Sequence, residues 1–161
     1  MSEKKRFETR EQPEAENFEV GENEWKIVTP PNTIETTGLG PCVGIIVYDP
    51  ELKKAMCGHY VWPEIGLDEM LDEAIKIFPD KSRLKIYVGG RNPRDDDPPY
   101  TFTKAKREYV KQSLASHGFQ NSQISIKWSD SSRESTVMRI DPGMGDVEYD
   151  QKEDYGDEDN D

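Results

Sequence analysis

Residues 42–62 read Cys-Val-Gly-Ile-Ile-Val-Tyr-Asp-Pro-Glu-Leu-Lys-Lys-Ala-Met-Cys-Gly-His-Tyr-Val-Trp, and this stretch decides the fold. Residues 43–48 are apolar on both alternating faces, which predicts a central strand covered on both sides. Residues 49–52 carry the Asp-Pro chemistry of a turn, and residues 54–62 read as a return strand that Pro63 stops. The stretch therefore predicts a β-hairpin whose first strand lies inside a sheet.

The register of this hairpin would bring a thiol beside an imidazole. A four-residue loop over 49–52 places Cys42 directly opposite His59, and Gly44 opposite Cys57. Residues that face each other on one side of antiparallel strands have Cβ atoms roughly 4.5–5.5 Å apart. A slip of one residue would turn His59 to the other face, so the pair depends on this register.

A cysteine beside a histidine is the arrangement that nucleophilic catalysis requires. The thiolate is the reactive species, and a neighbouring imidazolium lowers the pKa of the thiol. Residues 36–42 form a glycine-rich turn whose N–H groups could stabilise an oxyanion, and Gly44 would leave space for a substrate side chain. A second interpretation stays open, in which Cys42 is a small buried hydrophobe and His59 a satisfied strand residue.

The rest of the chain combines strands with two helices. Apolar residues recur at helical spacing over 67–78, and a second helix is expected over 103–116, before Gly118 at a position that commonly ends helices. Further strands are expected over 25–28, 84–88, 124–128, 136–140 and 147–149. These elements predict a layered domain of the α+β class.

Charge separates a neutral core from two acidic ends. The 161 residues carry a formal charge of −12. Residues 1–24 hold four basic and eight acidic residues, and residues 146–161 hold one basic and nine acidic residues, so the ends account for the whole charge. We predict one domain over 25–149 between disordered tails at 1–24 and 150–161.

Composition also limits the partners and the compartment. The acidic ends argue against binding to nucleic acid or to an anionic membrane surface. No stretch approaches the length of a membrane-spanning helix, and residues 1–10 are charged where a signal peptide is apolar. Two cysteines do not suggest a disulfide framework. A cytoplasmic protein without membrane insertion is expected.

Motifs around the hairpin form a longer signature. Residues 36–42 read Thr-Thr-Gly-Leu-Gly-Pro-Cys, and the two strands that follow are joined by Asp49-Pro50 and end in His59-Tyr60-Val61-Trp62-Pro63. This order resembles the chemoreceptor glutamine deamidase family, CheD, whose pattern is T-x-G-x-G-S-C, a strand, a D-P turn and a strand with H-x-x-x-P. Residues 85–90 and 141–147 resemble a later strand end and the closing turn of that family.

The resemblance implies a fold and a reaction. The fold would be an α/β/β/α layered sandwich, and the reaction would convert side-chain glutamine of a protein to glutamate and ammonia. The resemblance implies Cys42 as the nucleophile, His59 as the general base and acid, and Thr36 as the residue that orients the imidazole. The expected oxyanion or substrate contacts are the backbone groups of Gly40, Gly44, Gly89 and Gly90.

The same resemblance indicates the partners. A glutamine-bearing protein is the expected substrate, and the family name suggests a chemoreceptor. The same name suggests chemotaxis as the process in which the protein takes part. A regulatory partner protein is a further expectation. No metal or other cofactor is expected.

Two alternatives remain open. Pro41 stands where the family has Ser and carries no N–H, and residues 130–135 lack the glycines of the family, so the chain could be a CheD-like module that binds a partner without catalysis. A zinc site would have enough ligands but an unusual spacing in Cys42, Cys57, His59 and His117. A buried structural thiol is the simpler interpretation of Cys57, and a helix cap is the simpler one of His117.

Overall fold

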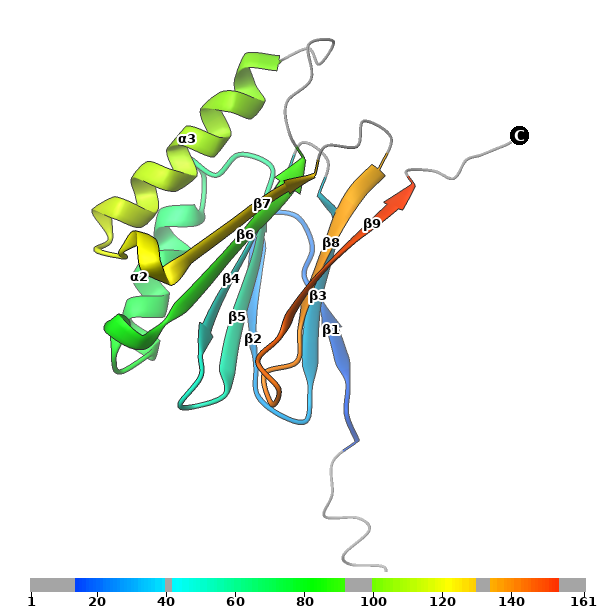
Figure 1. The fold of residues 1–161 in the computed structure, drawn as a ribbon, viewed down its shortest axis with the longest axis vertical. Coiled ribbons are helices and arrows are strands. Elements are labelled where there is room, and N and C mark those ends of the chain that lie inside the picture. The colour runs from blue at the N-terminus through cyan, green and yellow to red at the C-terminus, as the bar shows by residue number, and fades with distance from the viewer. Residues whose placement is uncertain (1–13, 40–41, 92–99, 130–133, 154–161) are drawn as a thin grey trace, which may run out of the picture.

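The computed structural model describes residues 14–39, 42–91, 100–129 and 134–153 (Figure 1). In chain order its elements are β1 (Asn17–Glu19), β2 (Glu24–Val28), β3 (Thr33–Leu39), β4 (Val43–Asp49), β5 (Lys54–Tyr60), α2 (Leu67–Ile77), the short 3₁₀ helix η1 (Lys81–Arg83), β6 (Lys85–Arg91), α3 (Tyr100–Ser116), the 3₁₀ helix η2 (Asn121–Gln123), β7 (Ile124–Ser129), β8 (Glu134–Ile140) and β9 (Val147–Glu153).

The apolar run over 43–48 forms the middle of the larger sheet, as predicted. Within the described residues this sheet has five strands in the order β2-β5-β4-β6-β7. Strand β4 pairs antiparallel with β5 and with β6, while β6 and β7 run parallel. Every residue of β4 is buried, which is the burial expected of a strand covered on both faces.

The two faces of this sheet are covered by different layers. Helices α2 and α3 cover one face, and a second sheet with the strand order β1-β3-β8-β9 packs on the other (Figure 1). Because side chains alternate along a strand, Ile45 and Val47 join the core beneath the helices, whereas Ile46 and Tyr48 join the core between the sheets. Residues of even number in β4 therefore face the second sheet.

The predicted α+β class is confirmed. The described residues hold two α-helices and two sheets, each of which mixes parallel and antiparallel pairs. No helix among these residues covers the outer face of the four-stranded sheet, so the fourth layer of the α/β/β/α sandwich stays a prediction. None of the described helices is long and apolar enough to span a membrane.

Both helices lie close to their predicted positions. Helix α2 begins at Leu67 as expected and ends one residue early, and it buries the apolar face that its spacing predicted. Helix α3 ends at Ser116 as expected but begins at Tyr100. Gly118 follows with φ of 89° and donates its N–H to the Ala115 carbonyl, which is the glycine-terminated helix end that the sequence predicted.

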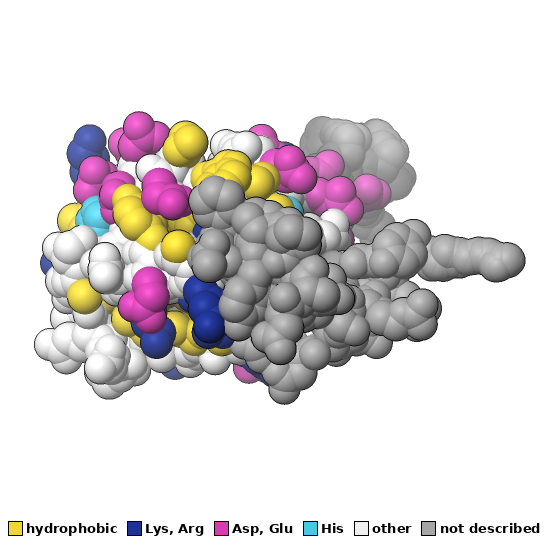
Figure 2. Space-filling view, turned by 90° about the horizontal axis from the view of Figure 1, so that it is seen from above, with side chains coloured by type: hydrophobic (Ala, Val, Ile, Leu, Met, Phe, Trp, Pro, Cys, Tyr) yellow, Lys and Arg dark blue, Asp and Glu magenta, His cyan; other side chains and the backbone are white. Residues whose placement is uncertain are grey.

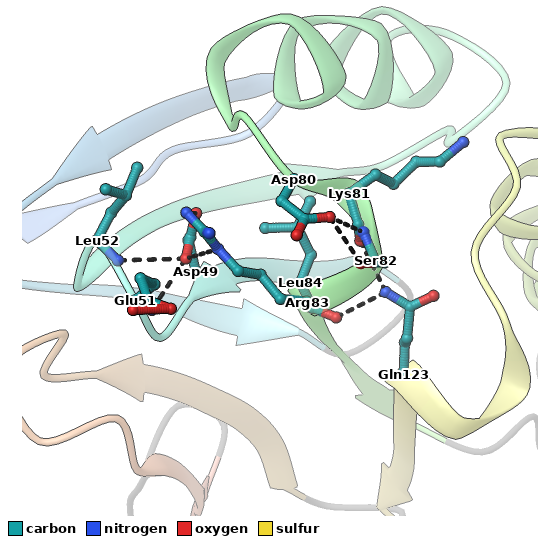
Figure 3. A network of polar contacts seen from close by, with 9 residues as sticks. All are labelled: Asp49, Glu51, Leu52, Asp80, Lys81, Ser82, Arg83, Leu84 and Gln123. Atoms are coloured by element: carbon teal, nitrogen blue, oxygen red, sulfur yellow. Dashed lines mark hydrogen bonds and ion pairs between the residues drawn. The ribbon is translucent and has the colours of Figure 1, made fainter.

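The hairpin register differs from the prediction by two residues. Asp49 pairs with Lys54 and Gly44 pairs with His59, so the four-residue loop covers 50–53 instead of 49–52. Strand β4 therefore includes Asp49, one residue more than predicted. The Asp49 carboxylate accepts the N–H groups of Glu51 and Leu52 at 3.0 and 3.2 Å, and these hydrogen bonds stabilise the turn that follows (Figure 3). Cys42 is therefore a diagonal neighbour of His59 and does not lie opposite it.

An ion pair holds this turn against η1, the short helix that precedes the strand on the other side of β4. Arg83 donates from Nε and Nη2 to the two oxygens of the Asp49 carboxylate at 2.9 and 3.0 Å (Figure 3). Burial alone would raise the pKa of Asp49, but the hydrogen bonds from Arg83, Leu52 and Glu51 hold it below its ordinary value. The hairpin end is thus tied to η1, directly before β6.

The glycine-rich segment was expected to be a turn, and its first part is a strand. Residues 36–39 belong to β3, which pairs with β1 and with β8. The pairing with β8 shifts register between Thr36 and Leu39, where Gly38 has φ of 73°. Such a bulge needs a long-range partner strand to form, which local turn chemistry does not reveal. Gly40 and Pro41 lie outside the described residues.

The ordered structure extends beyond the boundaries predicted at residues 25 and 149. Strand β1 and the buried Val20 precede residue 25, and β9 continues to Glu153. Long-range pairing recruits both segments, because β1 adds to β3 and β9 adds to β8. Residues 1–13 and 154–161, where disorder was predicted, lie outside the described residues.

Candidate active site

Thr36 fixes the tautomer of His59. The Thr36 hydroxyl donates to the carbonyl of Val20 at 2.9 Å, and its oxygen lies 2.7 Å from Nδ1 of His59. A hydroxyl has a single proton, and the Val20 carbonyl can only accept, so the Thr36 oxygen accepts the Nδ1–H of His59. The neutral imidazole consequently carries its lone pair on Nε2, which is buried and has no hydrogen-bond partner among the residues that the structure describes.

Cys42 lies near the imidazole ring of His59. It directly precedes β4, shares the inter-sheet face with His59, and has an exposed fraction of 6%. Its Sγ lies within 4.8 Å of a ring nitrogen of His59. Because Nδ1 is engaged by Thr36, Nε2 is the nitrogen that is available to the thiol. A shift of register by two residues leaves every side chain on the same face of the sheet. Cys42 and His59 therefore still share one face, as predicted.

A third group, Glu22, completes this cluster. One of its carboxylate oxygens lies within 4.8 Å of both the Cys42 Sγ and a His59 ring nitrogen. The turn that carries Glu22 is tied to both sheets, since Val20 donates its N–H to Glu35 and Asn23 donates its N–H to the His59 carbonyl at 2.6 Å. Glu22 itself is exposed. Its side chain therefore borders the cluster from the solvent side.

The electrostatics favour a neutral thiol and a neutral imidazole at rest. Burial raises the pKa of Cys42 to about 11, the Glu22 carboxylate adds to this rise, and the Lys106 ammonium opposes it. Burial lowers the pKa of His59, and Glu22 opposes that fall. The sequence led us to expect a thiol whose pKa is lowered by an imidazolium. In the structure the thiolate must instead form as the proton moves to Nε2.

Charge changes on either side of Cys42 should alter its reactivity in opposite directions. In a Cys57→Ala background, Glu22→Gln should lower the Cys42 pKa and make alkylation by iodoacetamide several-fold faster at a fixed pH near 8. Lys106→Met should raise the pKa and slow the same reaction. Alkylation rates measured across pH would check both changes, and equal effects of the two substitutions would contradict the assigned electrostatics.

An acidic groove leads to His59. It has a volume of about 450 Å³ and is lined by His59, Thr37 and Gly38 together with Glu19, Glu22 and Glu24. A Cβ atom added at Gly38 would meet nothing within 4 Å, so the groove is open at this point. Figure 2 looks onto the end of the molecule at which β3 leads into β4, and acidic side chains gather in groups on this face. The groove therefore connects one edge of the largely buried His59 side chain with solvent.

The described glycines among the predicted contacts serve close packing. A Cβ atom at Gly44 would approach side-chain atoms of Leu39 and Met138 to 2.6 and 2.8 Å, so the space expected there for a substrate is filled. Gly89 also packs against Met138, and a Cβ atom at Gly90 would lie 2.9 Å from the carbonyl oxygen of Cys42. Gly90 therefore lets the backbone of the cysteine approach β6. Oxyanion contacts from these glycines stay a prediction.

Adding one methyl group between the sheets should be costly. Gly44→Ala should destabilise the protein by about 1–3 kcal/mol, because Leu39 and Met138 are fully buried and have no room to move away. Denaturant unfolding of the full chain measures this loss. Gly143→Ala is the matched control, since its added Cβ would meet only ordinary contacts from 3.4 Å outward. Equal stabilities of the two variants would contradict the packing role.

The other cysteine and histidine lie away from the cluster. Cys57 is fully buried in the core between the sheets, and burial raises the pKa of its thiol, as expected of a structural residue. His117 follows α3, where Nδ1 lies 2.7 Å from the Ser113 carbonyl and Nε2 lies 3.0 Å from the Asp72 carboxylate. This is the predicted helix-end cap, so the four-residue zinc set is not assembled.

Sequence patterns did not reveal Glu22 and Lys106. Glu22 reaches the site because residues 20–23 form a turn between β1 and β2, and Gly21 and Asn23 are the signal that could have indicated that turn. Lys106 comes from α3, is buried, and lies with Nζ 4.7 Å from the centre of the Trp62 ring. Its approach to Cys42 depends on packing between distant elements, for which the local sequence has no signal.

Comparison with known proteins returns sequence relatives that are named as chemoreceptor glutamine deamidases. The chain is 46% identical over 48 residues to the chemoreceptor glutamine deamidase CheD of Halalkalibacterium halodurans, covering 30% of each chain. It is 39% identical over 61 residues to CheD of Bacillus licheniformis, covering 38% of this chain and 36% of the relative. It is 39% identical over 85 residues to the probable CheD of Geobacillus kaustophilus, covering 48% of this chain and 50% of the relative. The chain thus spans about a third to a half of these relatives.

Comparisons at the level of families and solved structures add less. No protein-family model matches the chain. The crystal structure of the hypothetical protein YfiH from Bacillus licheniformis overlaps with a TM-score of 0.49 at 16% sequence identity, covering 61% of this chain and 47% of that one.

Proposed function

We propose that this chain, which belongs to the CheD family, is a cysteine hydrolase that deamidates side-chain glutamine in a protein substrate. The observation that carries the proposal is the hydrogen bond from His59 Nδ1 to Thr36, because it leaves the Nε2 lone pair available on a ring that has a nitrogen within 4.8 Å of the Cys42 Sγ. The names of the relatives support a chemoreceptor as the substrate. A cytoplasmic location of this chain would be consistent with such a substrate.

The first half of the reaction forms a thioester. The Cys42 thiol transfers its proton to Nε2 of His59 as Sγ attacks the amide carbon of the glutamine side chain. The N–H of Cys42 itself is the proposed donor to the oxyanion, since Pro41 has none. The imidazolium then gives its proton to the amide nitrogen, ammonia leaves, and an Sγ–carbonyl bond remains.

The second half of the reaction consumes a water molecule. Water from the acidic groove reaches the thioester, and His59 Nε2 takes one of its protons as the oxygen attacks the carbonyl. The carbon–sulfur bond breaks, glutamate is released, and Cys42 regains its proton from the imidazolium. Throughout, the hydrogen bond to Thr36 keeps the ring in the orientation that both proton transfers need.

The test uses water labelled with heavy oxygen. The purified full chain is incubated in this water with the cytoplasmic segment of a Bacillus licheniformis chemoreceptor, and peptides are analysed by mass spectrometry. The proposal expects glutamines that become glutamates carrying one oxygen from the solvent. A panel of receptor segments without any labelled glutamate, from a chain that is folded by circular dichroism, would contradict the chemoreceptor substrate.

A module that binds a partner without catalysis is the second candidate. The burial of Cys42 and the rise of its pKa to about 11 favour it, because an unassisted thiol of this kind is a poor nucleophile. The two candidates differ in one result. A non-catalytic module would bind a receptor segment or a regulatory protein and leave every glutamine unchanged.

A further inference from the structure

We propose that Glu22, Cys42 and His59 form a binding site for Zn²⁺, and that the bound ion holds the cysteine in an unreactive form. The site stands on its own geometry. Only the loss of deamidase activity on zinc binding rests on the function proposed above.

The three ligand atoms already lie close together. A carboxylate oxygen of Glu22, the Sγ of Cys42 and a ring nitrogen of His59 are all within 4.8 Å of one another. Bonds of about 2.0–2.3 Å in a tetrahedral zinc site put neighbouring ligand atoms roughly 3.5 Å apart. Glu22 is exposed on a turn, so its side chain can supply most of the remaining closure. The three residues come from separate segments that the fold holds in place.

An independent observation points to a ligand at this cluster. His59 has an exposed fraction of 4%, and within the described part of the chain its buried Nε2 has no hydrogen-bond partner. A buried polar atom of this kind ordinarily has a partner. The opposite nitrogen donates to Thr36. Histidines that bind metals are held in the same way, by a hydrogen bond from the nitrogen that does not touch the metal.

The donor set and its charge select the ion. Thiolate and imidazole prefer zinc-like ions over Mg²⁺ or Ca²⁺, which take oxygen ligands. A Cys42 thiolate and a Glu22 carboxylate together balance the two positive charges of the ion. Three protein ligands also leave a fourth position, which the groove lined by Glu22 and His59 connects to solvent.

Zinc and catalysis compete for the same electron pairs. Binding releases the Cys42 thiol proton to solvent, because the thiolate is the metal ligand. Nε2 of His59 cannot accept a proton while its lone pair is bound to the ion, and the sulfur lone pairs are likewise engaged. The occupied protein therefore reacts neither with an amide nor with an alkylating reagent, and removal of the ion restores both reactions.

Zinc affinity of the full chain is measured by competition with a chromophoric chelator. Glu22→Gln should weaken zinc binding by at least about 10-fold. Even the loss of a residue that only hydrogen-bonds to a metal ligand lowers metal affinity by about that factor. Glu19→Gln is the matched control, since Glu19 lines the same groove outside the ligand cluster and should leave the affinity unchanged. A Cys42→Ala/His59→Gln variant measures background binding elsewhere in the acidic chain. Equal affinities of the Glu22 and Glu19 variants would overturn the site.

Two further readouts identify the ligands without any substrate. Co²⁺ in place of zinc should give a sulfur-to-cobalt charge-transfer band in the wild type that disappears in Cys42→Ala. In a Cys57→Ala background, Zn²⁺ should protect Cys42 from iodoacetamide, EDTA should reverse the protection, and Mg²⁺ should have no effect. Alkylation that proceeds unchanged at saturating Zn²⁺ would overturn the proposal.

The outcomes separate the two proposals. Protection by zinc in a chain that deamidates nothing would contradict the deamidase proposal alone. Deamidation that saturating Zn²⁺ leaves unaffected would contradict the zinc proposal alone.

Discussion

Replacing Cys42 with alanine should lower the rate of glutamine hydrolysis by about 10⁵-fold or more, since the variant cannot form the thioester. The rate is followed as the appearance of solvent-labelled glutamate in the receptor segment. Cys42 lies at the edge of the inter-sheet core with an exposed fraction of 6%, so the fold should be retained. Circular dichroism and the unfolding temperature check this.

Cys57→Ala is the matched control for that result. Cys57 points to the same side of the sheet but lies deep in the core and outside the cluster of Glu22, Cys42 and His59. The control variant should keep its activity despite a small loss of stability. Hydrolysis that survives Cys42→Ala, or that depends equally on both cysteines, would contradict the assignment of the nucleophile.

Replacing His59 with glutamine should lower kcat/KM by between about 10² and 10⁴-fold, because the variant has no group that can take the thiol proton. In the wild type, kcat/KM should fall as the pH drops through the His59 pKa, since only the neutral imidazole accepts a proton. Burial lowers that pKa, so this acid limb should lie below the ordinary value of 6.5.

The pH profile distinguishes a base from a structural role. The acid limb should disappear in His59→Gln, whose residual rate should instead rise with pH toward the Cys42 pKa of about 11 as thiolate forms without assistance. A variant that loses rate but keeps the wild-type acid limb would show that another group supplies the base.

Local sequence predicted the pair but not its exact register. The apolar run over 43–48 and the turn chemistry after it place Cys42 and His59 on one face, and this parity survives a shift of two residues. The shift itself follows from Asp49, which pairs with Lys54 while its carboxylate caps the turn and binds Arg83. A contact 34 residues away in the chain is not visible in the hairpin sequence.

The strand conformation of Thr36 and the position of Glu22 were not predicted, because both depend on contacts between segments that are distant in the sequence. Strand β3 forms because β1 and β8 flank it, and this pairing turns Thr36 from an expected turn residue into a strand residue whose hydroxyl spans Val20 and His59. Glu22 reaches the cluster because its turn is held by the hydrogen bonds from Val20 to the Glu35 carbonyl and from Asn23 to the His59 carbonyl. The contact between Thr36 and His59 agrees with the role that the resemblance implies for Thr36, and that role stays a prediction, whereas nothing in the motif pointed to Glu22.

The covalent intermediate provides the most direct test of the central claim. The wild-type chain is mixed with a chemoreceptor segment, quenched in acid during turnover, and analysed by mass spectrometry with and without hydroxylamine. The account predicts a conjugate in which a receptor glutamine, having lost ammonia, is joined to Cys42 by a bond that hydroxylamine cleaves. Deamidation without any conjugate, at a rate that Cys42→Ala leaves unchanged, would contradict it.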